Sequence, residues 1–274
     1  MESEEWRLIS ASADGDEDAM RAALAGGAAI DAVAPEGLAG VSGKRTALLA
    51  AVSRGRLQAA KLLLAEGASP GIHGGGTGAG LTPLLTAAAS LGASGIAAGV
   101  SAKSAASERP KSPWVALELV RLLLRPAYRI PHTHVATTGE TALHMLGGGG
   151  AGEERRHGCR WGPAGLQELR RVLATLLQPP TGPGRRLGWE MRGTGGRTAL
   201  MEAAIQSEPG CVGLFLELGA NATAADDGGE TALHHALTAL TDRLADHARL
   251  PPRHRSASSA AGIGAALRTV ALLA

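Results

Sequence analysis

The sequence has few aromatic residues, with 4 Trp, 1 Tyr and 1 Phe among 274 residues. A β-sandwich draws much of its core from aromatic and β-branched side chains, so this scarcity argues against such a fold. Hydrophobic residues still make up 45% of the chain, which is enough to bury a core of Leu, Ala, Val and Ile. The composition therefore predicts closely packed helices.

The chain also has few cysteines and a small net charge. Cys159 and Cys211 stand alone without CxxC spacing, which excludes a disulfide framework and a cysteine zinc site and fits a reducing compartment. A net charge of +2 gives no strong positive field of the kind that attracts nucleic acid, so we do not expect nucleic acid as the partner. No run of about 18 apolar residues occurs, and the acidic start "MESEEWRLIS" is unlike a signal peptide. We therefore expect a soluble intracellular protein, cytoplasmic or nuclear, without a membrane span.

The chain is instead rich in internal repetition. The hexapeptide "GETALH" occurs at 139–144 and at 229–234, and related motifs stand elsewhere in the sequence. Aligned on the threonine, five copies begin at Thr46, Thr82, Thr141, Thr198 and Thr231. Thr198 and Thr231 are 33 positions apart, a period typical of repeat solenoids.

Each unit carries signals for two helices. In four of the five copies a glycine two residues before the threonine supplies a turn, namely Gly80, Gly139, Gly196 and Gly229. The threonine hydroxyl can cap the first helix. Gly55 then breaks that helix, and Gly67 follows the second one, "LQAAKLLLAEG". With openings such as "RTALLAA" at 45–51 and "RTALMEAA" at 197–204, a mid-unit break and the ending "LLAEGA" at 63–68, the unit resembles the ankyrin repeat, which carries T-P-L-H-x-A-A and L-L-x-x-G-A.

The resemblance implies an all-α fold, an ankyrin-like α-solenoid of stacked helix-turn-helix repeats joined by β-turn fingers, in one array over 1–274. The segment 6–32 has the same helix, break and helix without the threonine motif, and we interpret it as an N-terminal capping unit. The last unit stops at "RTVALLA", before the G-A ending, so we expect the chain to be part of a longer protein. The six units lie near 6–40, 41–78, 79–135, 136–192, 193–226 and 227–274.

Three units are longer than the ankyrin pattern. The extra residues fall between the two helices of a unit, near 90–112, 147–163 and 241–264. These inserts are rich in Gly, Ser, Ala, Pro and Arg, a composition that does not bury enough apolar surface to offset the entropy of ordering. We therefore expect mostly disordered loops on the edge opposite the fingers.

Histidine is the main candidate for site chemistry. His144 and His234 each follow Thr-Ala-Leu, and in ankyrin-like repeats the imidazole at this place holds the threonine and the turn backbone. Other histidines, including His132, His134, His157 and His235, lack Cys or acidic partners at zinc-site spacing and are interpreted as surface residues. We expect no catalytic, cofactor or metal site.

We therefore expect a non-enzymatic scaffold that binds another protein, with no small-molecule substrate. The alternative is that the array is the targeting region of a larger enzyme, such as a ubiquitin ligase, kinase or acyltransferase, whose catalytic domain lies outside this chain. The resemblance implies recognition through finger tips and exposed first-helix positions on the concave face. Carried over by motif position, the candidate partner-binding residues are Arg45, Ser53, Arg54, Leu81, Glu140, Arg197, Glu202, Gln206, Glu230 and His235.

The inserts should be the segments most sensitive to protease, because they have few apolar anchors outside the stacked pairs. Limited trypsin digestion, followed by mass spectrometry, should cut first around Arg109, Arg155 or Arg253. First cuts inside "LQAAKLLLAEG" would contradict this order.

Overall fold

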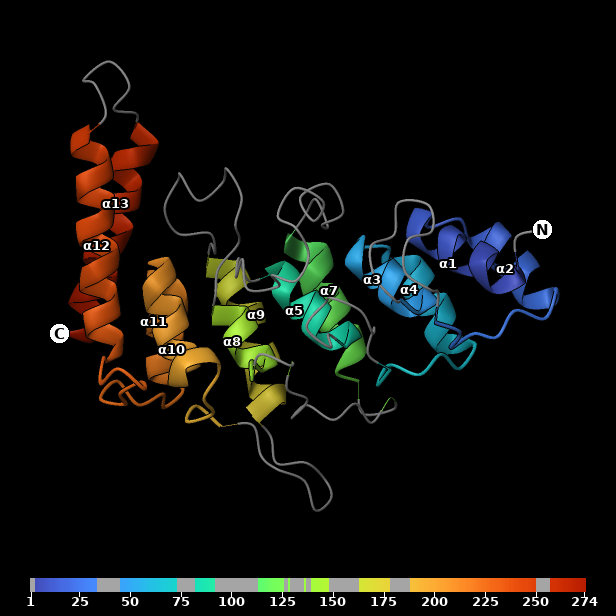
Figure 1. Ribbon diagram of the computed structural model, residues 1–274, viewed down its shortest axis with the longest axis horizontal. Helices are drawn as coiled ribbons and strands as arrows, with labels where there is room; N and C mark the ends of the chain where they lie inside the picture. Colours follow the sequence, from blue (N-terminus) through green and yellow to red (C-terminus); the bar gives the residue numbers. More distant parts are fainter. Residues whose placement is uncertain are drawn as a thin grey trace. The chain divides into compact units, whose positions relative to one another are not determined.

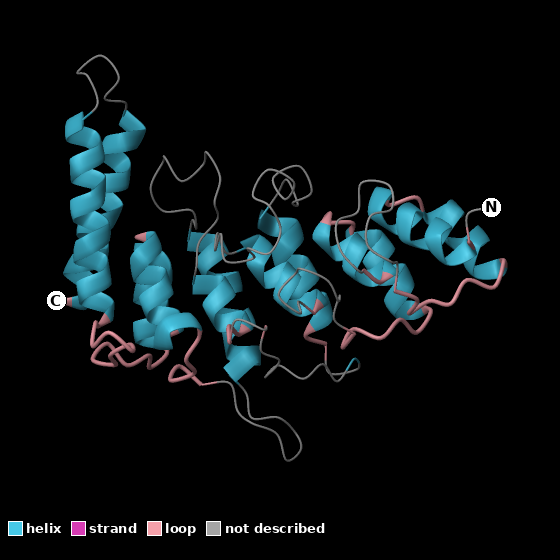
Figure 2. Ribbon diagram, in the orientation of Figure 1, coloured by secondary structure: helices cyan, strands magenta, loops and turns pink. Residues whose placement is uncertain are grey.

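The computed structural model describes the chain as an α-helical protein (Figures 1 and 2). Within the described residues the secondary structure consists of helices, with one isolated antiparallel bridge between Ala225 and Thr231. The described helices include none that is long and apolar enough to cross a membrane. The described residues are 3–33, 45–72, 82–91, 113–125, 128, 136, 139–147, 163–177, 188–249 and 257–274.

The chain divides into two compact units. The first comprises Met1–Leu91 and Gly95–Thr137, and the second comprises Gly92–Ser94 and Thr138–Ala274. Each unit is a two-layer stack of helix pairs.

In unit 1 the first helices of three pairs, α1, α3 and α5, pack side by side in one layer. The second helices, α2, α4 and α7, lie beside their partners in the other layer. The bounds are α1 Glu4–Asp14, α2 Glu17–Ala25, α3 Ala47–Ser53, α4 Leu57–Ala65, α5 Pro83–Leu91 and α7 Pro113–Leu123.

Unit 2 repeats this plan. The helices α8, α10 and α12 form the first layer, and α9, α11 and α13 form the second. The bounds are α8 Ala142–Gly147, α9 Pro163–Leu177, the 3₁₀ turn η3 Thr194–Gly196, α10 Ala199–Gln206, α11 Pro209–Glu217, α12 Ala232–Arg249 and α13 Ala257–Leu273.

The threonine of the motif begins the first helix, as predicted. The hydroxyls of Thr46, Thr82 and Thr198 accept hydrogen bonds from the backbone N–H three residues later, at 3.2 to 3.4 Å. The predicted helix breaks are confirmed as well, because Gly55 (φ 70°) and Gly67 (φ 93°) have the left-handed conformation that glycine adopts without strain.

Where the motif contains histidine, the imidazole braces the turn, as predicted. Nδ1 of His144 accepts a hydrogen bond from the backbone N–H of Thr141 at 3.2 Å and lies 2.9 Å from its hydroxyl. Nε2 then donates to the carbonyl of Arg197 at 3.0 Å, so the ring joins consecutive repeats within unit 2. Burial lowers the pKa of His144, and the Arg197 carbonyl only partly opposes this. His234 braces Thr231 at the same distances.

The third insert differs from the prediction. We expected a mostly disordered loop over 241–264, but α12 continues to Arg249 and α13 already begins at Ala257. The expectation of disorder is therefore wrong for most of this insert, because its Ala, Leu and Arg residues favour helix and extend both helices of the last pair. The interiors of the other two inserts, and the cleavage sites Arg109, Arg155 and Arg253, lie outside the described residues.

Truncating a core leucine should destabilise either unit. Leu63 on α4 and Leu200 on α10 are fully buried, so we expect Leu63→Ala and Leu200→Ala each to lower the free energy of unfolding by about 2–5 kcal/mol. Urea denaturation measures this loss. The matched control is Leu237→Ala on the exposed side of α12, which should cost less than about 1 kcal/mol. Equal losses for the three variants would contradict the assigned core.

Candidate partner-binding surface

In unit 1, three of the predicted residues form a polar group at the first helix of the second pair. Nη1 of Arg45 donates to Oγ of Ser53 at 2.9 Å, across the length of α3. Arg54, directly after that helix, forms an ion pair of 3.5 Å with Asp14 from the preceding pair. All three predicted side chains are half-buried, so part of each remains open to a partner. Leu81, another predicted residue, lies outside the described residues.

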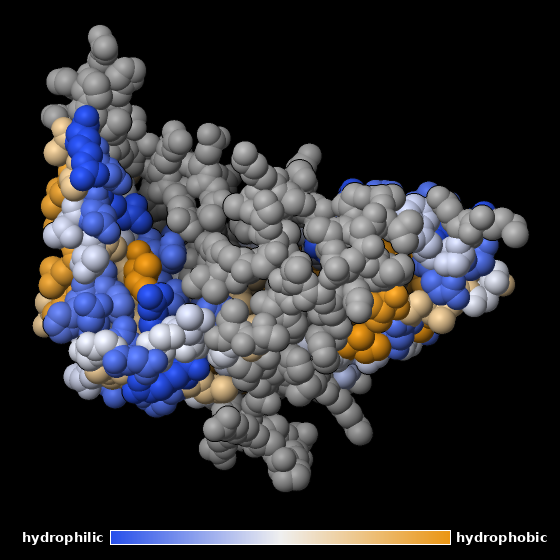
Figure 3. All heavy atoms as spheres, viewed as in Figure 1, coloured by the Kyte–Doolittle hydropathy of each residue, from blue (hydrophilic) through white to orange (hydrophobic). Residues whose placement is uncertain are grey.

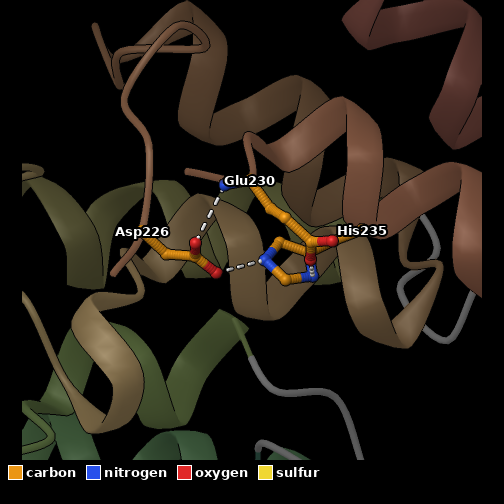
Figure 4. A group of neighbouring side chains, drawn as sticks. All are labelled: Asp226, Glu230 and His235. Carbon is orange, nitrogen blue, oxygen red and sulfur yellow. Dashed lines mark hydrogen bonds and ion pairs between the residues drawn. The ribbon is translucent and has the colours of Figure 1, made fainter. Parts of the chain in front are cut away.

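In unit 2, the residues from Asp226 to Glu230 form an exposed turn between α11 and α12, here called the 226–230 finger. The backbone N–H of Asp226 donates to the carbonyl of Glu230 at 2.9 Å. In return, Oδ1 of Asp226 accepts from the N–H groups of Gly228 and Glu230, each at 2.9 Å. Figure 4 shows the bond from Glu230. The aspartate therefore closes the finger from inside and leaves Asp227, Gly228 and Glu230 exposed.

The same contacts keep Asp226 ionised. The Glu230 N–H is the largest cause that lowers the pKa of Asp226, with smaller contributions from His235 and the Gly228 N–H. An ionised carboxylate is a stronger acceptor for these N–H groups, so the finger is held most firmly at neutral pH.

Three of the predicted surface residues are buried instead. Glu140, Glu202 and His235 occupy the right motif positions, but neighbouring repeats of unit 2 cover them. Oε1 of Glu140, for example, accepts from the Thr194 hydroxyl at 3.4 Å, beside η3. Their placement on the exposed surface is therefore wrong, and their role in partner binding stays a prediction.

Glu202 is a buried acid beside a single arginine. Its Oε1 lies 3.4 Å from Nη1 of Arg197, and 4% of its side chain is exposed. Burial is the main cause that raises the pKa of Glu202, and the charge of Arg197 opposes it. Arg197 itself is half-buried, as is Gln206, whose carbonyl accepts from Nη2 of Arg243 at 3.1 Å. Of these residues of unit 2, Arg197 and Gln206 are thus partly exposed, and Arg197 is held by its contact with Glu202.

His235 lies between two acids that the sequence analysis did not pair with it. Its Nε2 is 2.9 Å from Oδ2 of Asp226, and its Nδ1 is 3.5 Å from Oε2 of Glu230 (Figure 4). The interpretation of His235 as a surface residue without acidic partners is wrong. The missed signal was the preceding finger, because its turn returns Asp226 to the first turns of α12.

The last helix pair also exposes large apolar side chains. Figure 3 shows hydrophobic and hydrophilic residues side by side on the α12–α13 end of unit 2. These helices add apolar area to the surface that a protein partner can cover. The exposed leucines are Leu237, Leu244, Leu267 and Leu272.

Comparisons with known proteins agree with this architecture. The sequence pattern of the ankyrin repeat matches residues 43–74. Among solved structures, the chain is similar to an ankyrin repeat domain from Acinetobacter baumannii AYE, with a TM-score of 0.56 and 21% sequence identity. That likeness covers 97% of this chain and 98% of the other, and it shows the fold. No curated protein gives a significant match. Ankyrin repeats are in general protein–protein interaction modules, and their fold is typically non-catalytic.

Replacing Glu202 should change how stability depends on pH. Because the pKa of Glu202 is raised above its ordinary 4.5 in the folded state, its contribution to stability is present below that pH and is lost as pH rises through the folded pKa. Glu202→Gln removes this titration. We therefore expect the free energy of unfolding of Glu202→Gln, relative to the unsubstituted protein, to increase from about pH 4.5 to about pH 7.

Urea denaturation at several pH values measures this difference, with Glu66→Gln at the exposed end of α4 as the control. A difference for Glu202→Gln that stays constant or falls as pH rises would contradict the assignment.

Proposed function

We propose that this chain, which contains an ankyrin repeat and has the fold of an ankyrin repeat domain, is a non-enzymatic scaffold that binds a partner protein. The contact surface comprises the finger tips and the exposed parts of the first helices. In unit 1 it includes Arg45, Ser53 and Arg54, and in unit 2 it includes Arg197, Gln206 and the 226–230 finger.

The observation that carries this proposal is the internally bonded, exposed 226–230 finger. Two backbone donors converge on Oδ1 of Asp226, so the tip is ordered by contacts that no partner has to supply. Binding to a surface that is already ordered costs less conformational entropy than binding to a flexible loop. Asp227 and Glu230 are the charged residues at the exposed tip, and Asp227 is one that motif position alone did not identify.

The charges of the surface support a protein or peptide partner of mixed charge. Unit 1 presents the partly exposed Arg45 and Arg54, whereas the finger of unit 2 presents Asp227 and Glu230. A polyanion gains affinity from several cations in a row and is repelled by carboxylates. Protein interfaces instead pair charges of both signs around an apolar centre, and they also use exposed apolar side chains such as those on α12.

Charge reversal at the finger should weaken partner binding without unfolding the chain. We expect Asp227→Lys to reduce retention of a protein captured by the full chain by about tenfold, or about 1.4 kcal/mol. Asp227 is exposed, but its backbone N–H donates to the Gly195 carbonyl at 3.1 Å, so urea denaturation checks that the variant keeps its stability. The matched control is Glu66→Lys, at the end of a second helix and outside the proposed surface.

Capture is measured from nuclease-treated extract at about 200 mM salt, where phosphate contacts are weakened. Loss of the captured protein with Asp227→Lys and retention with Glu66→Lys is the expected result. Equal retention by both variants, or capture of nucleic acid alone, would contradict the proposal.

A further inference from the structure

Asp226, Glu230 and His235 form a group of potential metal ligands at the base of the 226–230 finger. Each side chain offers one ligand atom, and these atoms lie within 4.8 Å of one another. The imidazole is 10% exposed and the Glu230 side chain is 53% exposed, so the group is buried on one side and open to solvent on the other.

The hydrogen bonds of this group decide which ring nitrogen carries the proton. A carboxylate oxygen is an acceptor, so the 2.9 Å contact between Oδ2 of Asp226 and Nε2 of His235 places a proton on Nε2. In the neutral ring Nδ1 then has a free lone pair. That lone pair faces Oε2 of Glu230, a second acceptor, at 3.5 Å.

Two hydrogen-bond acceptors that face each other repel, and the contact becomes favourable only when a cation lies between them. The cation is either a proton, which would make the ring an imidazolium, or a metal ion. Zinc binds imidazole nitrogen and carboxylate oxygen at about 2.0–2.2 Å, so two ligand atoms on one tetrahedral ion lie about 3.3 Å apart. The observed 3.5 Å between Nδ1 and Oε2 is close to that spacing.

Glu202 is a further buried acid on the neighbouring first helix, and its Oε1 lies 3.4 Å from Nη1 of Arg197. It occupies in α10 the motif position that His235 occupies in α12, and these two helices pack against each other. Its Oε2 is buried and makes no hydrogen bond within the described part of the chain. The positive form of His235 favours the ionised form of Glu202, so the two groups interact. The carboxylate of Glu202 therefore adds to the negative potential that His235 experiences.

We propose that this group is a binding site for a divalent cation of the zinc class. Nδ1 of His235 and Oε2 of Glu230 bind the ion directly, and solvent completes its coordination on the exposed side. Asp226 accepts the Nε2 proton and fixes the ring, as outer carboxylates do for metal-bound histidines. Glu202 contributes negative charge from the buried side. The combination of imidazole with carboxylate favours zinc over calcium or magnesium, which prefer ligand sets made of oxygen alone.

Isothermal titration of zinc chloride into the chelator-treated full chain tests the proposal. We expect binding of one zinc ion at this site, accompanied by a rise in Tm. Glu230→Gln, which keeps the shape of the exposed side chain, should weaken zinc binding by at least about tenfold. The matched control is Asp227→Asn, which removes the neighbouring carboxylate of the same finger and should leave the affinity unchanged.

His235→Gln should abolish binding at this site, and circular dichroism checks that the variant is folded. If that variant does not fold, the comparison of Glu230→Gln with Asp227→Asn decides alone. The chain has nine histidines, so zinc binding that is equal in the unsubstituted protein and in Glu230→Gln would place the ion elsewhere and overturn the proposal. Absence of zinc binding would also overturn it and leave the imidazolium as the cation between the two acids.

Discussion

A pair of short helices with apolar side chains on both sides cannot bury them alone, and the rest of this structure depends on that constraint. In each unit the pairs must stack, and the first helices meet through small residues that allow close approach. Ala50 and Ala51 on α3, and Ala203 and Ala204 on α10, are all buried. The leucines of the second helices, such as Leu63, then fill the layer behind them. Stability therefore resides in many similar interfaces between neighbouring pairs.

Stacking also determines where the polar residues lie. In α10 and α12 the same motif position holds a polar side chain, and these two helices pack against each other. Glu202 and His235 become buried in this way, although each is polar. The charge of His235 acts on the pKa of Glu202, and Asp226, from the finger before α12, contacts His235 at 2.9 Å. The finger and the buried polar group are therefore one structure, with an exposed tip and an anchored base.

Local features of the fold could be predicted from the sequence because their causes are local. Thr46 caps α3 by accepting from the N–H of Leu49, three residues later. Gly55 adopts a left-handed conformation, and His144 lies one helical turn from Thr141. Each depends on residues within a few positions. The prediction that Glu202 is exposed was wrong because burial has a distant cause. Glu202 is covered by the next repeat, 33 positions away along the chain.

Two further errors have different physical reasons. The insert over 241–264 was judged by its Gly, Ser and Pro, whereas Ala, Leu and Arg around them extend α12 and α13 as helix. His235 was judged by spacing rules for zinc ligands within one segment, but its acid partners come from the finger that precedes α12. Neither the folding back of a finger nor the end of a helix can be derived from composition alone.

The central claim is that the exposed finger is ordered by its own aspartate and so is ready to bind. Native-state hydrogen exchange measures this directly at the amides of Gly228 and Glu230, which donate to Oδ1 of Asp226 at 2.9 Å. We predict that both amides are protected in the free protein, despite their exposure, and that Asp226→Ala removes this protection while the core amide of Leu49 stays protected. Exchange of both amides at the rate of an unfolded chain, in the protein with Asp226 intact, would contradict the account.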